Sequence, residues 1–143
     1  MTPNETMIKF GYPATLVRDF VHWCVLARPA QATLGALVLV CKDDAQSFSA
    51  IPAAAFGELA TVTAELEQSL RAFRPFSKIN YLMLMMVDKD VHFHVLPRYD
   101  TVQSFGGQDF PDPGWPAMPD LSRATNPTSM SDLVAALKAA WVG

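Results

Sequence analysis

One carboxylate and two imidazoles alternate with apolar residues in the segment Asp90-Val91-His92-Phe93-His94. On an extended strand, side chains at alternate positions project from the same face. Asp90, His92 and His94 are therefore expected on one face, while the apolar residues between them face the core. Neighbours on that face stand roughly 6–7 Å apart, so the three polar groups can converge on one small ligand.

Two kinds of chemistry fit these residues. A neutral imidazole near pH 7 is a competent nucleophile, and a protonated imidazole donates hydrogen bonds to phosphate oxygens. Arg98 lies on the same face by parity and could add positive charge, although an ordinary arginine at a strand end has the same pattern. Two imidazoles and a carboxylate also suit iron, zinc or nickel. Consecutive ligands on a straight strand surround a metal poorly without a bulge, and two exposed histidines with no function are the simplest alternative.

The elements that must position this segment are strands and one long helix. The segment 15–26 predicts one or two strands, and 36–41 predicts a strand buried on both faces. Apolar residues at spacings of three and four predict a helix of about 22 residues from near Pro52 to Pro75. The runs 79–87 and 91–99 then form an antiparallel hairpin, which turns at Asp88-Lys89.

The last third of the chain differs in composition. Residues 100–128 carry five of the eleven prolines and three glycines, which predicts an irregular arm without helix or ladder. Ser129 can cap a closing helix, with Asp132 three residues later. We expect one α+β domain over 1–143 with an antiparallel sheet, comprising a core at 14–99, an arm at 100–128 and a C-terminal helix at 129–142.

The composition excludes several classes of protein. Half of the 143 residues are hydrophobic and 17% are charged, which argues against a disordered chain. A net charge of −3 offers no footprint for nucleic acid. The longest apolar runs, 34–41 and 81–87, are shorter than a membrane span, and the N-terminus lacks an apolar stretch of signal-peptide length. We expect a cytoplasmic protein that binds neither nucleic acid nor membrane and needs no metal or other cofactor.

The run His92-Phe93-His94-Val95-Leu96-Pro97-Arg98 resembles the second half of the histidine-triad (HIT) signature, in which three histidines alternate with apolar residues and Pro-Arg often follows. The order of elements over 15–99 is also similar to that family. The resemblance implies a HIT-like fold, with a five-stranded antiparallel sheet, one long helix packed on it and a C-terminal helix. It further implies a homodimer, a nucleotide or phosphorylated metabolite as ligand, and phosphohydrolase or nucleotidyl transferase activity.

Residue roles also follow from the resemblance. His92 matches the histidine that attacks the α-phosphorus, and His94 matches the histidine that contacts the phosphate. Asp90 and Arg98 are further candidates for binding the substrate phosphate. Asp90 could instead orient His92 by accepting a hydrogen bond from its ring.

The chain departs from the family pattern at three places. Asp90 stands where the first histidine of the triad belongs, and Gly35-Ala36 replaces the familiar Gly-His pair. No glutamine of a phosphate loop lies between Met86 and Asp90. Fewer phosphate donors remain, so the alternative is a catalytically weakened module that binds a nucleotide or metabolite without turnover.

Overall fold

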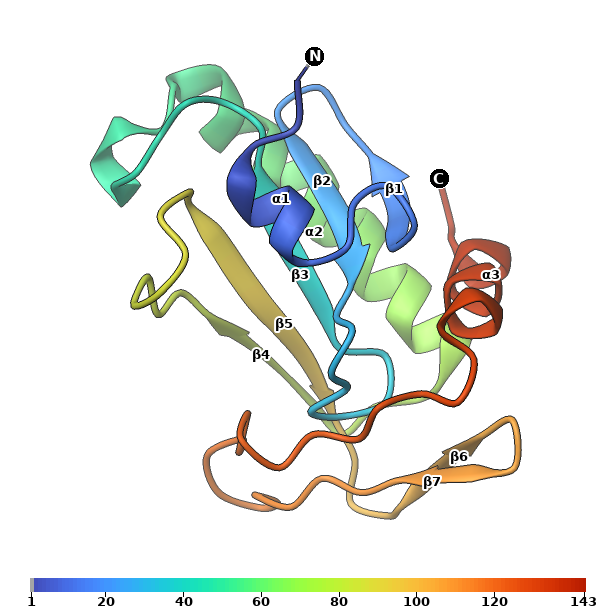
Figure 1. Cartoon of the computed structure of the whole chain (residues 1–143). Coiled ribbons are helices and arrows are strands. Elements are labelled where there is room, and N and C mark those ends of the chain that lie inside the picture. Colours follow the sequence, from blue (N-terminus) through green and yellow to red (C-terminus); the bar gives the residue numbers. More distant parts are fainter. Residues whose placement is uncertain (1) are drawn as a thin grey trace.

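The computed structural model describes residues 2–143, and its centre is a five-stranded antiparallel sheet with strand order β1-β2-β3-β5-β4. The sheet and its α+β class confirm the expectation from the sequence. Each strand pairs antiparallel with its neighbours, and β1 and β4 are the edges (Figure 1). The five strands are β1 (Leu16–Asp19), β2 (Trp23–Ala27), β3 (Leu37–Cys41), β4 (Lys78–Leu82) and β5 (His92–Arg98).

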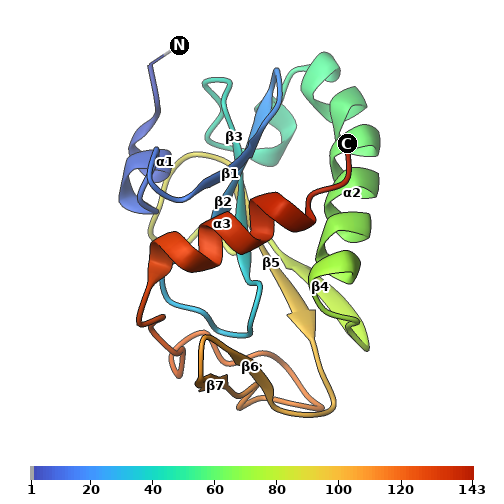
Figure 2. The same cartoon turned by 90° about the vertical axis from the view of Figure 1, so that its right-hand side faces the viewer.

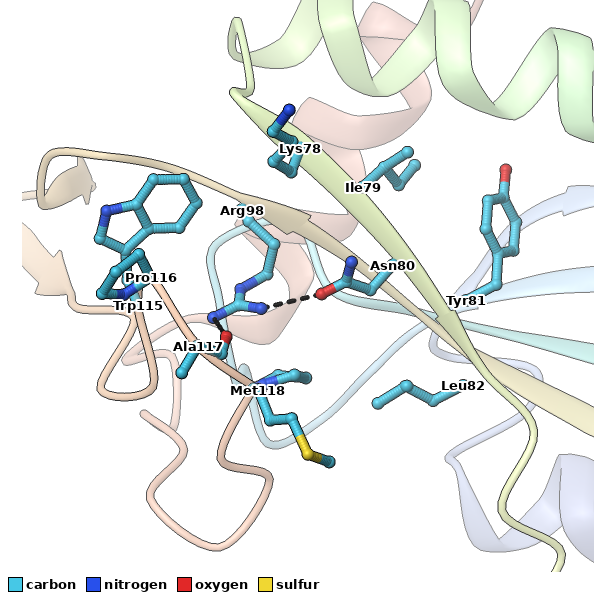
Figure 3. Close-up of a pocket in the computed structure, with 11 residues that line it drawn as sticks. Lys78, Ile79, Asn80, Tyr81, Leu82, Arg98, Trp115, Pro116, Ala117 and Met118 are labelled. Carbon is cyan, nitrogen blue, oxygen red and sulfur yellow. Dashed lines mark hydrogen bonds between the residues drawn. The ribbon is translucent and has the colours of Figure 1, made fainter.

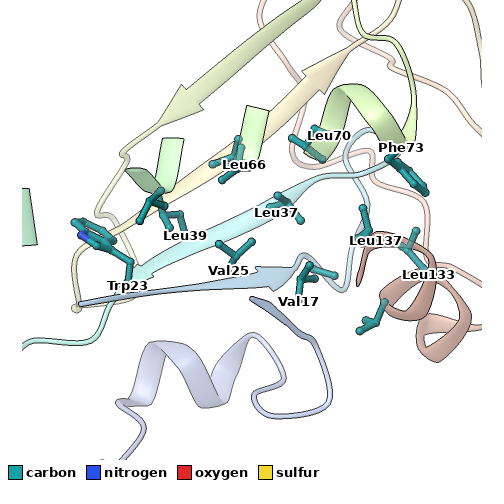
Figure 4. Packing of buried hydrophobic residues seen from close by; sticks show 14 of the residues in the cluster. Val17, Trp23, Val25, Leu37, Leu39, Leu66, Leu70, Phe73, Leu133 and Leu137 are labelled. Atoms are coloured by element: carbon teal, nitrogen blue, oxygen red, sulfur yellow. The ribbon is translucent and has the colours of Figure 1, made fainter. Parts of the chain in front are cut away.

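The long helix α2 (Ala53–Phe73) covers one face of this sheet, as predicted. Leu66 and Leu70 of α2 lie in one buried cluster with Leu37 and Leu39 of β3 (Figure 4). All four side chains are at most 1% exposed, and burying a leucine contributes about 1.5–3 kcal/mol. This packing holds the central strands against the helix.

A short helix, α1 (Glu5–Lys9), covers the opposite face and was not predicted from the sequence. Figure 2 shows α1 and α2 on opposite sides of the sheet. The Asn4 side chain caps α1 by accepting a hydrogen bond from the Met7 amide at 2.9 Å. Met7 is fully buried with Leu26 and Val38, which point away from α2 because strand side chains alternate.

The C-terminal helix α3 (Met130–Ala140) confirms the predicted closing element. The Ser129 hydroxyl accepts from the Asp132 amide, which is the predicted cap. Leu133 and Leu137 enter the same cluster as α2, and α3 lies across the β1 side of the sheet (Figure 2). Within residues 2–143, no helix combines the length and the apolar character that crossing a membrane requires.

The connection from β4 to β5 is longer than the predicted two-residue turn. The antiparallel pairing is confirmed, but β4 ends at Leu82 and residues 83–91 form a loop. Met86 and Val87 are 85% and 81% exposed, so this apolar run is not a buried strand. Met85 adopts a φ of +53°, which breaks the extended conformation.

The Pro-rich arm (residues 100–128) contains one element that its composition argued against. Strands β6 (Gln103–Phe105) and β7 (Gln108–Phe110) pair as a small hairpin. Gly106 and Gly107 both adopt positive φ at its turn, which glycine does readily and which two-residue hairpin loops require. The prediction of no ladder was therefore wrong, because the same glycines that break strands also build tight turns.

Candidate active site

His92 and His94 lie side by side on the α1 face of the sheet. On the neighbouring strand β3, His92 pairs with Val40 and His94 pairs with Val38. The centroids of the two imidazole rings are 5.3 Å apart, and the Phe10 ring lies 6.0 and 5.8 Å from them. The strand alternation predicted from the sequence therefore holds for both histidines.

The protein backbone fixes the tautomer of His92. Its Nδ1 lies 2.7 Å from the carbonyl oxygen of Asp90. A carbonyl oxygen only accepts hydrogen bonds, so Nδ1 carries the proton. In the neutral ring, Nε2 then keeps its lone pair. The His92 side chain is 2% exposed, which holds the ring in this orientation.

The Asp90 carboxylate does not join the histidines. Its Oδ2 accepts from the Thr6 hydroxyl at 2.9 Å and from the Thr6 amide at 3.3 Å. The Asp90 amide in turn lies 3.3 Å from the Thr6 hydroxyl oxygen. Because β5 begins at His92, Asp90 lies outside the regular strand. The prediction that its side chain shares one face of this strand with His92 and His94 is therefore wrong. Its carboxylate instead ties the β4–β5 loop to α1.

A cavity of about 270 Å³ opens beside the two histidines, and we call it the histidine cavity. This volume is slightly below the usual range for small-molecule sites. Its walls come from four parts of the chain: the end of α1, the residue after β2, the β4–β5 loop and strand β5. The lining residues are Lys9, Phe10, Arg28, Leu84, Met85, Met86, Val87, Asp88, His92 and His94.

Ion pairs hold the loop wall of this cavity to α1. The Lys9 ammonium lies 2.8 Å from the Asp88 carboxylate, and Lys89 lies 3.5 Å from Glu5. Both pairs are partly exposed, so each contributes at most about 1 kcal/mol. With Thr6 and Asp90, these are three pairs of polar residues that link α1 to one short loop segment.

His94 occupies an environment that disfavours its charged form. The pKa of His94 is lowered to about 4, mainly by burial and then by the charge of Arg28 and by the neighbouring His92, while Asp88 opposes the shift. Its Nδ1 is buried and makes no hydrogen bond within the described chain. His94 is therefore neutral near pH 7, and its contact with a phosphate stays a prediction.

Arg98 lies elsewhere, in a hollow of about 750 Å³ between β4 and the Pro-rich arm (Figure 3). Its guanidinium donates to Asp112 at 3.0 Å, to Asn80 at 2.8 Å and to the Ala117 carbonyl at 3.0 Å. Arg98 and Asp112 are 4% and 5% exposed. No histidine lines this hollow, so the larger of the two spaces is not the one that contains a nucleophile.

Arg28 is one of the cavity-lining residues that the sequence analysis missed. It follows β2 directly and lines the histidine cavity. The alternation of side chains along β2 does indicate this position. Cys24 and Leu26 face α1, so Arg28, two residues further on, is expected on the same face. Using this alternation required knowing that β3 lies between β2 and β5. Lys9 and Phe10 offered no comparable signal because α1 has only five residues.

The side chains that could bind a metal ion do not lie together in the described residues. Among residues 2–143, no three histidine, cysteine, aspartate or glutamate side chains are grouped so that they could hold a metal ion. The Asp90 carboxylate faces Thr6, which leaves two imidazoles without a third ligand. Asp90, His92 and His94 are therefore not placed as a joint set of metal ligands.

Comparison with known proteins identifies the fold. No family model matches the sequence, and no curated protein matches it either. Among solved structures, a histidine triad protein from Sinorhizobium meliloti has a TM-score of 0.70 at 19% identity, covering 95% of this chain and 93% of that one. A histidine triad protein from Marinobacter aquaeolei has a TM-score of 0.67 at 17% identity, covering 98% and 95%.

A third solved structure is similar at the same level. A hypothetical histidine triad nucleotide-binding protein from Sulfolobus tokodaii has a TM-score of 0.67 at 14% identity, covering 94% of this chain and 88% of that one. The similarities span nearly the whole chain but at low identity. The chain therefore has the HIT-like fold, which confirms the expected fold class.

Proposed function

We propose that this protein is a nucleotide-binding phosphohydrolase or nucleotidyl transferase in which His92 is the nucleophile. The fixed tautomer of His92 carries the proposal. Its Nδ1 is held by the Asp90 carbonyl at 2.7 Å, so the other ring nitrogen keeps a lone pair on a residue that lines a cavity. The HIT-like fold, shared with a protein named as nucleotide-binding, supports a nucleotide as ligand.

The proposed reaction has two steps. The Nε2 of His92 attacks the α-phosphorus, an N–P bond forms, and the bond from phosphorus to the leaving group breaks with its electrons on that group. The leaving group takes up a proton from the solvent. Water then attacks the same phosphorus and gives a proton to the solvent, the N–P bond breaks, and a nucleoside monophosphate leaves. An alcohol or a phosphate in place of water gives nucleotidyl transfer. Each step displaces one group on phosphorus, and His92 returns to its starting form.

His94 is proposed to contact the phosphate as a neutral ring. A neutral imidazole has one N–H to donate, and its buried Nδ1 makes no hydrogen bond within residues 2–143. We assign no ligand contact to Asp90 or Arg98, because their charged groups are bonded to Thr6 and to Asp112.

One observation favours a binding module as the second candidate. Neither Asp90 nor Arg98 lines the histidine cavity, and His94 is neutral near pH 7, so few groups remain to stabilise a transition state. A protein of this kind holds the nucleotide without turning it over. AMP binding that survives His92→Asn, in a protein without turnover, would identify it.

A homodimer is also proposed. Strand β4 is an edge of the sheet, whereas the other edge, β1, is covered by α3 (Figure 2). An uncovered edge presents unpaired backbone groups and commonly pairs with another chain. Small-angle scattering at micromolar concentration should give the mass of two chains. The mass of one chain would contradict the proposal.

Turnover of defined substrates tests the enzyme proposal. The purified protein is incubated with adenosine 5′-phosphoramidate and with dinucleoside polyphosphates, and AMP release is measured by chromatography. We expect turnover that His92→Ala abolishes. The control is His22→Ala, since His22 is paired with Asp43 at 2.8 Å and does not line the histidine cavity. Absence of AMP release across this panel would contradict the enzyme proposal.

A further inference from the structure

Arg28 carries a charge that no described residue neutralises. Its side chain lines the histidine cavity, and its Nε is buried without a hydrogen-bond partner in residues 2–143. The guanidinium makes one side-chain hydrogen bond, from Nη1 to the Ala30 carbonyl. Within the described chain it forms no ion pair with a carboxylate. An arginine that loses water in this way normally has an anionic partner.

The backbone of Arg28 is held firmly, so its position is set by the fold. The Arg28 amide donates to the Ala36 carbonyl at 2.9 Å. Its carbonyl accepts from the Gln31 side chain at 2.7 Å. Gln31 is fully buried and also accepts from the Gly35 amide at 2.8 Å. This turn presents Arg28 to the cavity with a small cost in entropy on binding.

The charges of the residues that line the cavity predict the sign of the ligand's charge. Lys9 and Arg28 are cations, Asp88 is the one carboxylate, and His94 is neutral near pH 7. Lys9 and Asp88 form an ion pair at 2.8 Å, so their charges cancel. Arg28 is then the charged side chain of the lining that has no counter-charge beside it. A ligand with one negative charge at the same place restores neutrality.

We propose that Arg28 binds the phosphoryl group of the ligand, so that the histidine cavity takes phosphate esters or anhydrides and not neutral nucleosides. The inference rests on the proposed function, in which His92 faces the same phosphorus. A guanidinium presents planar N–H donors that match the oxygens of a phosphate. Arg28 thereby supplies the charge that a protonated His94 would have supplied.

Binding measurements on matched variants test this assignment. The affinities of wild type, Arg28→Met and Arg28→Lys for AMP, inorganic phosphate and adenosine are measured by calorimetry. Arg28→Met should weaken AMP and phosphate binding about tenfold or more, the loss typical of a charge-assisted hydrogen bond. Arg28→Lys keeps the charge but loses the planar donors, so it should lose less affinity than Arg28→Met, and adenosine should bind weakly to all three proteins. Arg123→Met is the control, because this exposed arginine is paired with Asp120 outside the cavity.

A second measurement uses the wild type alone, so it does not depend on whether a variant folds. The Arg28 Nε–H resonance should shift on addition of phosphate, because this group has no partner in residues 2–143. An unmoved resonance would overturn the assignment. So would equal AMP affinity in wild type and Arg28→Met, or a wild type that binds neither AMP nor phosphate in the millimolar range.

Failure of this inference can be told apart from failure of the proposed function. Arg28-dependent AMP binding without turnover of any substrate would keep the role of Arg28 and remove the chemistry of His92. Turnover that His92→Ala abolishes, with AMP affinity insensitive to Arg28→Met, would keep the chemistry and remove the role of Arg28.

Discussion

The Nδ1 of His92 donates to the backbone carbonyl of Asp90 over 2.7 Å, while the Asp90 carboxylate is bonded to Thr6. Orientation of the proposed nucleophile therefore comes from the main chain of residue 90 and not from its side chain. Aspartate in place of the first histidine of the triad pattern leaves this contact intact. The contact with Thr6 joins the same residue to α1.

The first prediction is that Asp90→Asn keeps the tautomer of His92. The backbone carbonyl remains after this substitution, so Nδ1 should stay protonated and Nε2 should stay unprotonated in the neutral ring. Nitrogen-15 NMR of the histidine ring measures this directly. A switch of the proton to Nε2 in Asp90→Asn would show that the carboxylate, and not the carbonyl, governs the ring.

The second prediction concerns the Thr6 hydroxyl. Thr6→Val removes a donor at 2.9 Å from a carboxylate that is 3% exposed, so the free energy of unfolding should fall by about 1–3 kcal/mol. Urea unfolding measures the change. Thr61→Val is the matched control, since Thr61 is an exposed residue of α2 and should change stability by less than about 0.5 kcal/mol. Equal effects of the two substitutions would contradict a buried role for Thr6.

The third prediction is a pH dependence of stability that comes from His94. The pKa of His94 is about 4 in the folded protein, below the ordinary value of 6.5. The unfolded chain then binds more protons between these two values, so stability falls as the pH drops from 6.5 to 4 and is constant above 6.5 with respect to this group. His94→Gln should remove this component, roughly 1–2 kcal/mol after allowance for solvent at the cavity mouth.

The groups that set this shift are Arg28, His92 and Asp88, and burial is the largest cause. The measurement is the difference between the unfolding free energies of wild type and His94→Gln at several pH values, which isolates the contribution of His94. A difference that does not depend on pH would show that His94 titrates normally.

The fourth prediction compares two arginine–aspartate pairs: Arg98 of β5 with Asp112 of the Pro-rich arm, and Arg123 with Asp120, both in the arm. Arg98 and Asp112 are almost fully buried, whereas Arg123 and Asp120 have side chains that are 65% and 30% exposed. Arg98→Met should lower the free energy of unfolding by about 3–5 kcal/mol, because it leaves a buried carboxylate unpaired. Arg123→Met should cost at most about 1 kcal/mol. Thermal unfolding of both variants measures the contrast, and similar losses would contradict it.

Much of the fold could be predicted because its signals are local and regular. Period-two alternation placed His92 and His94 together, since both lie inside strand β5. Prolines near both ends and apolar residues at helical spacing predicted α2 to within a residue or two. The same alternation failed for Asp90, which precedes the strand by two residues and is fixed by a contact with Thr6, far away in the sequence.

The placement of α1, Arg98 and Arg28 depends on contacts between residues far apart in the sequence, which no local pattern predicts. The helix α1 is only five residues long, and it is held by its Asn4 cap and by contacts to the β4–β5 loop. Arg98 has the parity of the histidines but lies further along β5, where the arm supplies Asp112. Arg28 becomes a site residue only once the order of the strands is known.

Trapping the covalent intermediate tests the role of His92 most directly. Wild-type protein is mixed with adenosine 5′-phosphoramidate, quenched in alkaline denaturant to preserve the N–P bond, and examined by mass spectrometry. The account predicts an added nucleoside monophosphate on the peptide that contains His92, and none on His92→Asn. Rapid turnover without such an adduct, or an adduct on His94 or any other residue, would contradict it.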